Sequence, residues 1–229
     1  MSAATILAID TCGPLGSVAL ARLEEDEIGL LGQTELPGKT YSAQLVPAIR
    51  DLLAAHNLAS AQVAAIVVTQ GPGSFTGIRI GLATAKGLAE AHSIPIVAVS
   101  RLAVLAHKAQ TAAAALDASR GEFYYGDFSG DSQESLLTRD AFLAPASTLG
   151  PRLAVCEPAV HAAAPSATLV EPPTAADALR HALSRLRARD FDDPVTLDGH
   201  YLRRSDAEIF SPPAPRPGAP PRPGSAPQP

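Results

Sequence analysis

Cysteine is scarce in this chain and long apolar runs are missing, and each absence excludes a class of protein. The two cysteines, Cys12 and Cys156, are far apart and form no C-x-x-C pair, which excludes a disulfide framework and a four-thiolate zinc site. No stretch reaches the ~18 consecutive apolar residues of a membrane-spanning helix. The first residues also lack the basic region of a signal peptide. We therefore expect a cytoplasmic protein with reduced thiols and no membrane partner.

Charge is also sparse, and positive charge is in deficit. Only 18% of the 229 residues are charged, and 18 Lys and Arg against 23 Asp and Glu leave a formal net charge of −5. A domain that holds nucleic acid by itself is normally basic, so this composition argues against direct binding and leaves binding through a partner open. Hydrophobic residues make up 46%, enough for the core of one large domain or two small lobes.

The six histidines form no recognisable metal-ligand pattern. Neither H-E-x-x-H nor H-x-x-x-H occurs, and each histidine is better explained as a surface or core residue than as a ligand. We therefore expect no metal and no cofactor. The histidines are His56, His92, His107, His161, His181 and His200.

The hydrophobic pattern predicts alternating strands and helices in a mixed α/β fold with a central sheet. Residues 1–100 are expected to form an N-terminal lobe and residues 101–210 a smaller C-terminal lobe. Residues 211–229 contain 9 of the 21 prolines and no large apolar residue, so a disordered tail is expected there. Within 141–173 only one strand is assigned. The predicted strands are Thr5–Asp10, Ser17–Leu23, Glu27–Leu36, Val63–Thr69, Pro95–Val99, Ala112–Asp117, Glu122–Phe128 and Arg152–Cys156; the predicted helices lie near Ser42–His56, Thr76–His92, from about Arg101, and at Ala175–Arg189.

A glycine-rich loop between a buried strand and a helix is the strongest local signal. Gly71 and Gly73 permit a sharp backbone turn, and Ser74 or Thr76 can cap the helix that follows. Such a helix end can bind a phosphate, but a tight strand-to-helix turn explains the same residues, and the local pattern alone slightly favours the turn. The loop does not fit the patterns G-x-x-x-x-G-K-S/T, G-x-S-x-G or G-x-G-x-x-G. Asp10 and Thr11, at the end of the first strand, either face a nucleotide or secure a turn. Asp117, Arg120 and Glu122 bracket another turn, where an Asp–Arg pair fits a structural role as well as a catalytic one.

The helix expected after this loop carries more apolar surface than one sheet can cover. Its polar residues form one narrow stripe, whereas a helix on a single sheet needs an apolar arc of only ~100°. The second apolar side either packs within the chain or meets a partner. On the partner interpretation the interface comprises Leu45, Ile49, Leu52, Gly77, Ile80, Gly81 and Thr84.

Four segments together resemble the bacterial TsaB family. They are Ile6–Thr11, the run GPGSFTGIRIG at 71–81, DASRGEFY at 117–124, and Tyr201–Arg204. The resemblance covers about residues 5–206, and the Gly-Pro-Gly-Ser-Phe-Thr-Gly run is its most specific part.

The resemblance implies an actin-like ATPase/sugar-kinase (ribonuclease H-like) fold with two related lobes. It also implies a non-catalytic role in making N6-threonylcarbamoyladenosine beside the tRNA anticodon. Such a subunit pairs through its first two helices with the catalytic subunit TsaD, or with a second copy of itself, and TsaE completes the complex. The subunit contacts tRNA only as part of that complex.

The catalytic relative carries its metal on His-x-x-x-His, and in this chain Arg101 and Leu105 occupy the matching places. Neither side chain ligates iron or zinc. Tyr41 stands where many family members have histidine, near the start of the first long helix. Two alternatives are an ATPase or phosphotransferase of the same fold that uses Asp10 and the loop at 71–76, and a peptidase, for which no motif is present.

Overall fold

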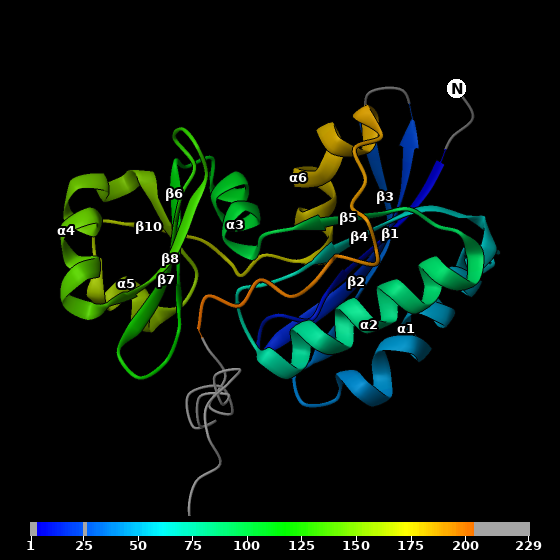
Figure 1. Cartoon of the computed structure of the whole chain (residues 1–229), viewed down its shortest axis with the longest axis horizontal. Helices are drawn as coiled ribbons and strands as arrows, with labels where there is room; N and C mark the ends of the chain where they lie inside the picture. The colour runs from blue at the N-terminus through cyan, green and yellow to red at the C-terminus, as the bar shows by residue number, and fades with distance from the viewer. Residues whose placement is uncertain (1–3, 25–26, 204–229) are drawn as a thin grey trace, which may run out of the picture.

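The computed structural model describes residues 4–24 and 27–203. The expected proline-rich tail at 211–229 lies outside the described residues. Figure 1 shows two sheets side by side, each covered by helices. The first sheet has the order β3-β2-β1-β4-β5. Its strands are β1 (Ala4–Asp10), β2 (Leu15–Glu24), β3 (Glu27–Pro37), β4 (Val63–Thr69) and β5 (Ile96–Val99).

The second sheet repeats the connectivity of the first. Its order is β10-β9-β6-β7-β8, so in both sheets an antiparallel meander of three strands is followed by two strands parallel to the first. This confirms the two related lobes expected from the sequence. The strands are β6 (Ala113–Asp117), β7 (Glu122–Asp127), β8 (Gln133–Thr138), β9 (Leu153–Val155) and β10 (Thr168–Leu169).

The helices cover both faces of each sheet, and two of them are exchanged between the lobes. Helices α1 (Tyr41–Ala55) and α2 (Phe75–His92) lie side by side on one face of the first sheet. Helix α6 (Ala175–Ala188) packs on the other face, although it follows the second sheet in the chain. Conversely, α3 (Arg101–Ala109) follows the first sheet but packs on the second, and α3 and α6 contact each other. The second sheet's other face carries α4 (Arg139–Leu149) and α5 (Pro158–Ala163).

Strand β1 shows how a fully buried strand serves two cores. Leu7 and Ile9 pack toward α1 and α2, whereas Ile6 and Ala8 pack toward α6. Successive side chains on a strand point to opposite faces, so a strand covered on both faces is apolar throughout. The predicted continuous apolar strand at Val63–Thr69 is β4, with its bounds unchanged.

The sequence pattern missed parts of the second lobe. The strand β8 and the helices α4 and α5 were not predicted. Helix α4 contains Pro145, and proline has a low helix propensity, so the sequence did not indicate a helix there. Pro47 lies within α1 without ending it, as expected. The helix predicted at the end of the C-terminal lobe is α6, and the structure packs it on the first sheet.

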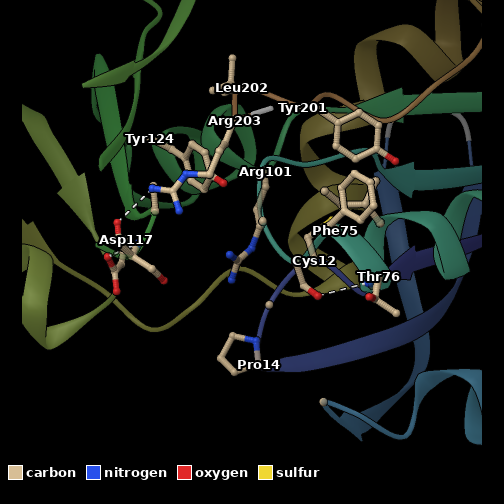
Figure 2. Close-up of a pocket in the computed structure, with 18 of the residues that line it drawn as sticks. Cys12, Pro14, Phe75, Thr76, Arg101, Asp117, Tyr124, Tyr201, Leu202 and Arg203 are labelled. Atoms are coloured by element: carbon tan, nitrogen blue, oxygen red, sulfur yellow. Dashed lines mark hydrogen bonds between the residues drawn. The ribbon is translucent and has the colours of Figure 1, made fainter. Parts of the chain in front are cut away.

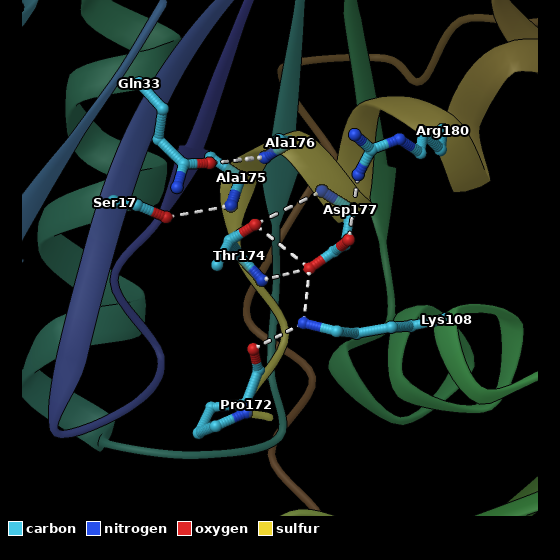
Figure 3. A network of polar contacts seen from close by, with 9 residues as sticks. All are labelled: Ser17, Gln33, Lys108, Pro172, Thr174, Ala175, Ala176, Asp177 and Arg180. Atoms are coloured by element: carbon cyan, nitrogen blue, oxygen red, sulfur yellow. Dashed lines mark hydrogen bonds and ion pairs between the residues drawn. The ribbon is translucent and has the colours of Figure 1, made fainter. Parts of the chain in front are cut away.

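Side chains from four elements fix the first turn of α6 (Figure 3). Ser17 Oγ of β2 accepts a hydrogen bond from the Ala175 amide at 2.8 Å, and Gln33 Oε1 of β3 accepts one from the Ala176 amide at 3.2 Å. Asp177 Oδ2 accepts from Lys108 Nζ of α3 at 2.9 Å and from the Thr174 amide at 3.0 Å. This network therefore joins the two exchanged helices.

Replacing Asp177 with asparagine is expected to lower the free energy of unfolding by about 2 kcal/mol at neutral pH, because the side chain loses charge-assisted hydrogen bonds. Burial alone would raise the pKa of the Asp177 carboxyl, but the hydrogen bonds from Lys108 and Thr174 leave this pKa lowered. The stabilisation is therefore present above the unfolded pKa of about 3.9 and is lost as the pH falls through the lower folded pKa.

Urea denaturation of the two proteins from neutral to acidic pH measures this difference, which should shrink below about pH 4. The matched control is Asp51→Asn, since Asp51 pairs with Arg50 on the surface, with side chains 67% and 73% exposed, and should change stability little. A difference between Asp177→Asn and the unmodified chain that persisted undiminished into acid would contradict the prediction.

Candidate functional site

A pocket of about 1000 Å³ opens between the two lobes. Its walls come from the β1–β2 turn, the starts of α1, α2 and α3, the β6–β7 turn and the segment after α6, so neither lobe forms it alone. Both lobes contribute polar side chains, and Figure 2 shows several of them converging on the space between the sheets. The lining residues used below are Cys12, Gly13, Lys39, Tyr41, Gly73, Ser74, Phe75, Thr76, Arg101, Asp117, Arg120, Tyr124, Glu157, His200, Tyr201 and Arg203.

The glycine-rich loop forms one wall of the pocket through its second half. Gly73, Ser74 and Thr76 line the pocket, whereas Gly71 lies behind it. Gly71 has φ +113°, which a residue with a side chain rarely adopts, and its carbonyl accepts a hydrogen bond from the Arg101 amide at 2.7 Å. Ser74 is the N-cap of α2, with its hydroxyl accepting from the Gly77 amide at 3.2 Å. The loop therefore sets the relative positions of α2 and α3.

Asp10 and Thr11 do not face the pocket. Both are buried: Asp10 Oδ1 accepts a hydrogen bond from the Cys12 amide at 2.9 Å, and Thr11 Oγ1 donates to the Gly77 carbonyl at 2.7 Å. Burial raises the pKa of the Asp10 carboxyl, and the positive charge of Arg101 opposes that rise. Of the two interpretations that the sequence leaves open, these contacts favour the one in which the pair secures the turn after β1.

Arg101 is a site residue that the sequence did not assign to the pocket. It begins α3, whose N-cap Ser100 accepts hydrogen bonds from the Leu102 and Ala103 amides. Its side chain reaches the β1–β2 turn, where a Cβ added at Gly13 would lie 2.6 Å from its guanidinium. Figure 2 shows this guanidinium at the centre of the pocket. The sequence feature that could have pointed to this role is an arginine in the first turn of an otherwise apolar helix. Leu105, one turn later, is fully buried.

The Cys12 thiol is unsuited to act as a nucleophile, although it lines the pocket. Its Sγ donates to the Thr69 carbonyl at 3.2 Å. Burial, followed by the nearby Asp10 charge, raises the pKa of the Cys12 thiol well above its ordinary value. The thiolate is the reactive form of cysteine, so this side chain stays protonated and unreactive.

The segment after α6 crosses from the first lobe to the second at the pocket's rim. Tyr201 packs against Phe75 of α2 with ring centroids 5.0 Å apart and ring planes tilted by 47°, and Arg79 Cζ lies 3.8 Å from the Phe75 ring centroid. On the second lobe, His200 Nε2 lies 2.9 Å from Glu134 Oε2, and Arg203 pairs with Glu122. This segment therefore contacts both lobes at the rim of the pocket.

Most residues of the expected partner interface are inside the chain. Leu45, Ile49 and Leu52 belong to the core between α1, α2 and the first sheet. Gly77 and Gly81 are buried against Thr11, so their lack of a side chain serves close packing of α2 on β1. Of the expected set, Ile80 and Thr84 remain partly exposed. Five of the seven residues expected at the interface are therefore buried within this chain.

Residues 4–24 and 27–203 contain no group of three His, Cys, Asp or Glu side chains arranged to hold a metal ion. Within the same ranges no helix combines the length and the hydrophobicity required to cross a membrane.

Comparisons with known proteins agree on one family. The family model described as TsaD, tRNA N6-adenosine threonylcarbamoyltransferase, matches residues 35–185. The TsaB protein of Haemophilus influenzae is 38% identical over 53% of this chain and 52% of its own length, so the chain spans about half the length of such curated relatives. An uncharacterised protein of Mycobacterium tuberculosis is 32% identical over 89% of this chain and 94% of its own length.

A solved structure extends the agreement to the fold. It is an uncharacterised Pseudomonas aeruginosa protein with similarity to peptidase YEAZ, 29% identical to this chain. The match covers 87% of this chain and 100% of that one, with a TM-score of 0.72. The expected α/β fold of the actin-like ATPase/sugar-kinase type is thereby confirmed. The chain belongs to the family of the tRNA N6-adenosine threonylcarbamoyltransferase TsaD and is a TsaB-like member of it.

Proposed function

We propose that this chain works as TsaB does in tRNA threonylcarbamoyladenosine biosynthesis. It supports transfer of the threonylcarbamoyl group to N6 of the adenosine next to the tRNA anticodon, and the transfer itself is performed by a TsaD-like partner. The resemblance to TsaB proteins supplies the pathway. The chemistry of the pocket supports the division of labour.

The observation that carries the non-catalytic role is the start of α3. The resemblance places the two metal-binding histidines of the catalytic relative at Arg101 and Leu105. Here a buried guanidinium points into the pocket and the leucine lies in the core, and neither side chain offers a lone pair to a metal. With the Cys12 thiol protonated, the described pocket lacks an activated cysteine as well.

Pairing is assigned to the outer surface of α1 and α2. Val46 of α1 is 62% exposed, and the exposed face of α2 carries the small residues Ala83, Gly87 and Ala91. Ile80 lies partly exposed on the same helix. Small residues let another backbone approach closely, so a helix of the partner can pack along this surface. A second copy of the chain can use the same surface, and a TsaE-like ATPase joins the pair; with a net charge of −5, this chain meets tRNA only through the complex.

The test is pairing with the TsaD protein of the same organism, measured by light scattering on a sizing column. The unmodified chain should give a one-to-one complex, and Val46→Asp should weaken the pairing at least tenfold while the thermal midpoint of the isolated chain stays unchanged. Leu143→Asp is the matched control, because Leu143 is 40% exposed on α4 of the other lobe and should pair normally. Absence of a complex with the unmodified chain, or normal pairing of Val46→Asp, would sink the proposal.

An ATPase or phosphotransferase based on Asp10 is disfavoured by the position of this carboxyl. It lies behind the turn, hydrogen-bonded to the Cys12 amide, and outside the pocket lining.

A further inference from the structure

The chain after α6 runs from the first lobe to the second, and its residues 190–203 are called the strap below (Figure 1). Its attachment to the first lobe is made largely by the main chain. The Asp192 amide donates to the Ile96 carbonyl of β5 at 2.9 Å, and the His200 amide donates to the Gln70 carbonyl at 2.8 Å. Leu197 adds a side chain that is buried in the core of the first lobe. None of these contacts depends on a titratable side chain.

The attachment of the strap to the second lobe is made by side chains, and two of them form ion pairs. His200 Nε2 lies 2.9 Å from Glu134 Oε2 of β8. Arg203 pairs with Glu122 of β7. Between these pairs, Leu202 packs against the core of the second lobe. On this lobe the hold of the strap therefore depends on charge.

The His200–Glu134 pair differs from the Arg203–Glu122 pair in its response to pH. Arginine keeps its charge, whereas histidine loses its proton near neutrality. Glu134 Oε2 and His200 Nε2 are both buried, and neither has another hydrogen-bond partner among the described residues. When His200 is neutral, this carboxylate oxygen is still shielded from water but no longer faces a positive charge, which is costly. The attachment at this point is therefore weaker.

The Glu134 carboxylate is also the charge that acts on His200. Contact with it raises the pKa of His200 above the ordinary value of 6.5, and burial opposes this rise. The pair therefore stabilises the joined lobes fully below that ordinary value, and the stabilisation is lost as the pH rises through the raised pKa. The other charged side chains on the strap and on the elements around His200 are Arg79, Arg101, Asp198 and Arg203.

We propose that His200 and Glu134 form a pH-sensitive latch between the two lobes. With His200 protonated, the latch holds the strap on the second lobe. With His200 neutral, the latch weakens and the lobes separate more often. Residues 200–203 all line the pocket, so its mouth widens when the strap leaves the second lobe. This inference concerns the isolated chain and does not depend on the pairing proposed above.

The first measurement is the pKa of His200 in the isolated full chain, obtained by nuclear magnetic resonance from the ring proton signals. The signal that disappears in His200→Gln identifies the residue. In the unmodified chain this pKa should lie above the ordinary value of 6.5, and Glu134→Gln should lower it, because the partner charge is gone.

The second measurement is the distance between the lobes, followed by electron–electron double resonance between two spin labels. The labels are attached through Glu35→Cys on β3 and Ala144→Cys on α4, at exposed positions of opposite lobes. Cys12 and Cys156 are buried, and burial raises the pKa of both thiols, so they should not react with the label. Dilution with unlabelled chain removes distances between copies.

The population with separated lobes should be larger at about pH 8.5 than at about pH 6. Each pKa unit that Glu134 adds to His200 corresponds to about a tenfold change in the ratio of separated to joined chains, so the titration fixes the size of the expected change. In Glu134→Gln the ratio should be the same at both pH values.

The matched control is Glu122→Gln, which breaks the pair with Arg203. Since arginine does not titrate in this range, the variant should enlarge the separated population by the same factor at both pH values and keep the pH response. A second histidine pair lies where α3 meets α6, with the rings of His107 and His181 5.3 Å apart. Burial, followed by the neighbouring His107, lowers the pKa of His181, and every variant retains this pair.

Identical distance distributions of the unmodified chain at the two pH values would overturn the proposal. So would a His200 pKa that Glu134→Gln leaves unchanged, or a pH response that persists in Glu134→Gln. If Glu134→Gln does not fold, His200→Gln gives the decision, because it removes the titrating ring and should abolish the pH response of the distances.

Discussion

Replacing Gly77 with alanine should lower the free energy of unfolding by about 3 kcal/mol or more. A Cβ at this position would lie 1.9 Å from the carbonyl oxygen of Thr11, which is a backbone atom and cannot rotate away. The same segment is tied to α2 by the hydrogen bond from Thr11 Oγ1 to the Gly77 carbonyl at 2.7 Å. The helix must therefore move off β1, and the core beneath it opens.

For Gly87, ten residues later in the same helix, we expect the opposite effect of an alanine substitution on stability. A Cβ there meets nothing within 4 Å, so Gly87→Ala should raise the free energy of unfolding by about 0.5–1 kcal/mol through helix propensity alone. Urea denaturation followed by circular dichroism measures both variants. If Gly77→Ala proved as stable as Gly87→Ala, the close approach of α2 to the turn after β1 would be disproved.

Replacing Ile49 with aspartate should unfold the chain, at a loss of more than about 4 kcal/mol. Ile49 is 4% exposed in the core between α1, α2 and the first sheet, so the new carboxylate would be buried among apolar side chains without a partner. Val46→Asp, one turn earlier on the same helix, places the same charge at a 62% exposed position and should leave stability nearly unchanged.

Circular dichroism spectra and thermal midpoints of the two variants check this contrast. It also decides which variant can test pairing: a partner lost by Ile49→Asp would report an unfolded chain, whereas a partner lost by Val46→Asp would report the surface. A folded Ile49→Asp protein, or an unfolded Val46→Asp protein, would show that the burial assigned to α1 is wrong.

The strands and helices of the first lobe could be predicted from the sequence because the patterns that identify them are local. Strands such as Val63–Thr69, covered on both faces, are continuous apolar runs, and the helix after the glycine loop has a clear start at Ser74. The second lobe is built from alanine-rich and proline-containing segments whose helical character depends on packing. Phe142 of α4, fully buried and stacked on Phe123 of β7, shows how tertiary contacts decide such a segment.

The candidate site was predicted in part. The residues that were not predicted reach the site through contacts between segments far apart in the sequence. Gly73, Ser74 and Thr76 line the pocket, as a functional interpretation of the loop requires. Arg101 was known only as a replacement for a metal ligand, and no local pattern says that its side chain turns toward Gly13 of the first lobe. The apolar excess of α2 was read correctly as two buried sides, but sequence order cannot distinguish α1 from a partner as the cover.

The exchange of α3 and α6 between the lobes bears on how the chain folds during its synthesis. The face of the first sheet formed by Ile6, Ala8, Ala65, Val67 and Val97 is covered by α6. The strands of that sheet are complete at residue 99, but the helix that covers this face ends only at residue 188. While the ribosome adds the intervening residues, the nascent first lobe presents an apolar face. We expect the nascent chain to be most prone to aggregation during this interval, because transiently exposed apolar surface promotes association.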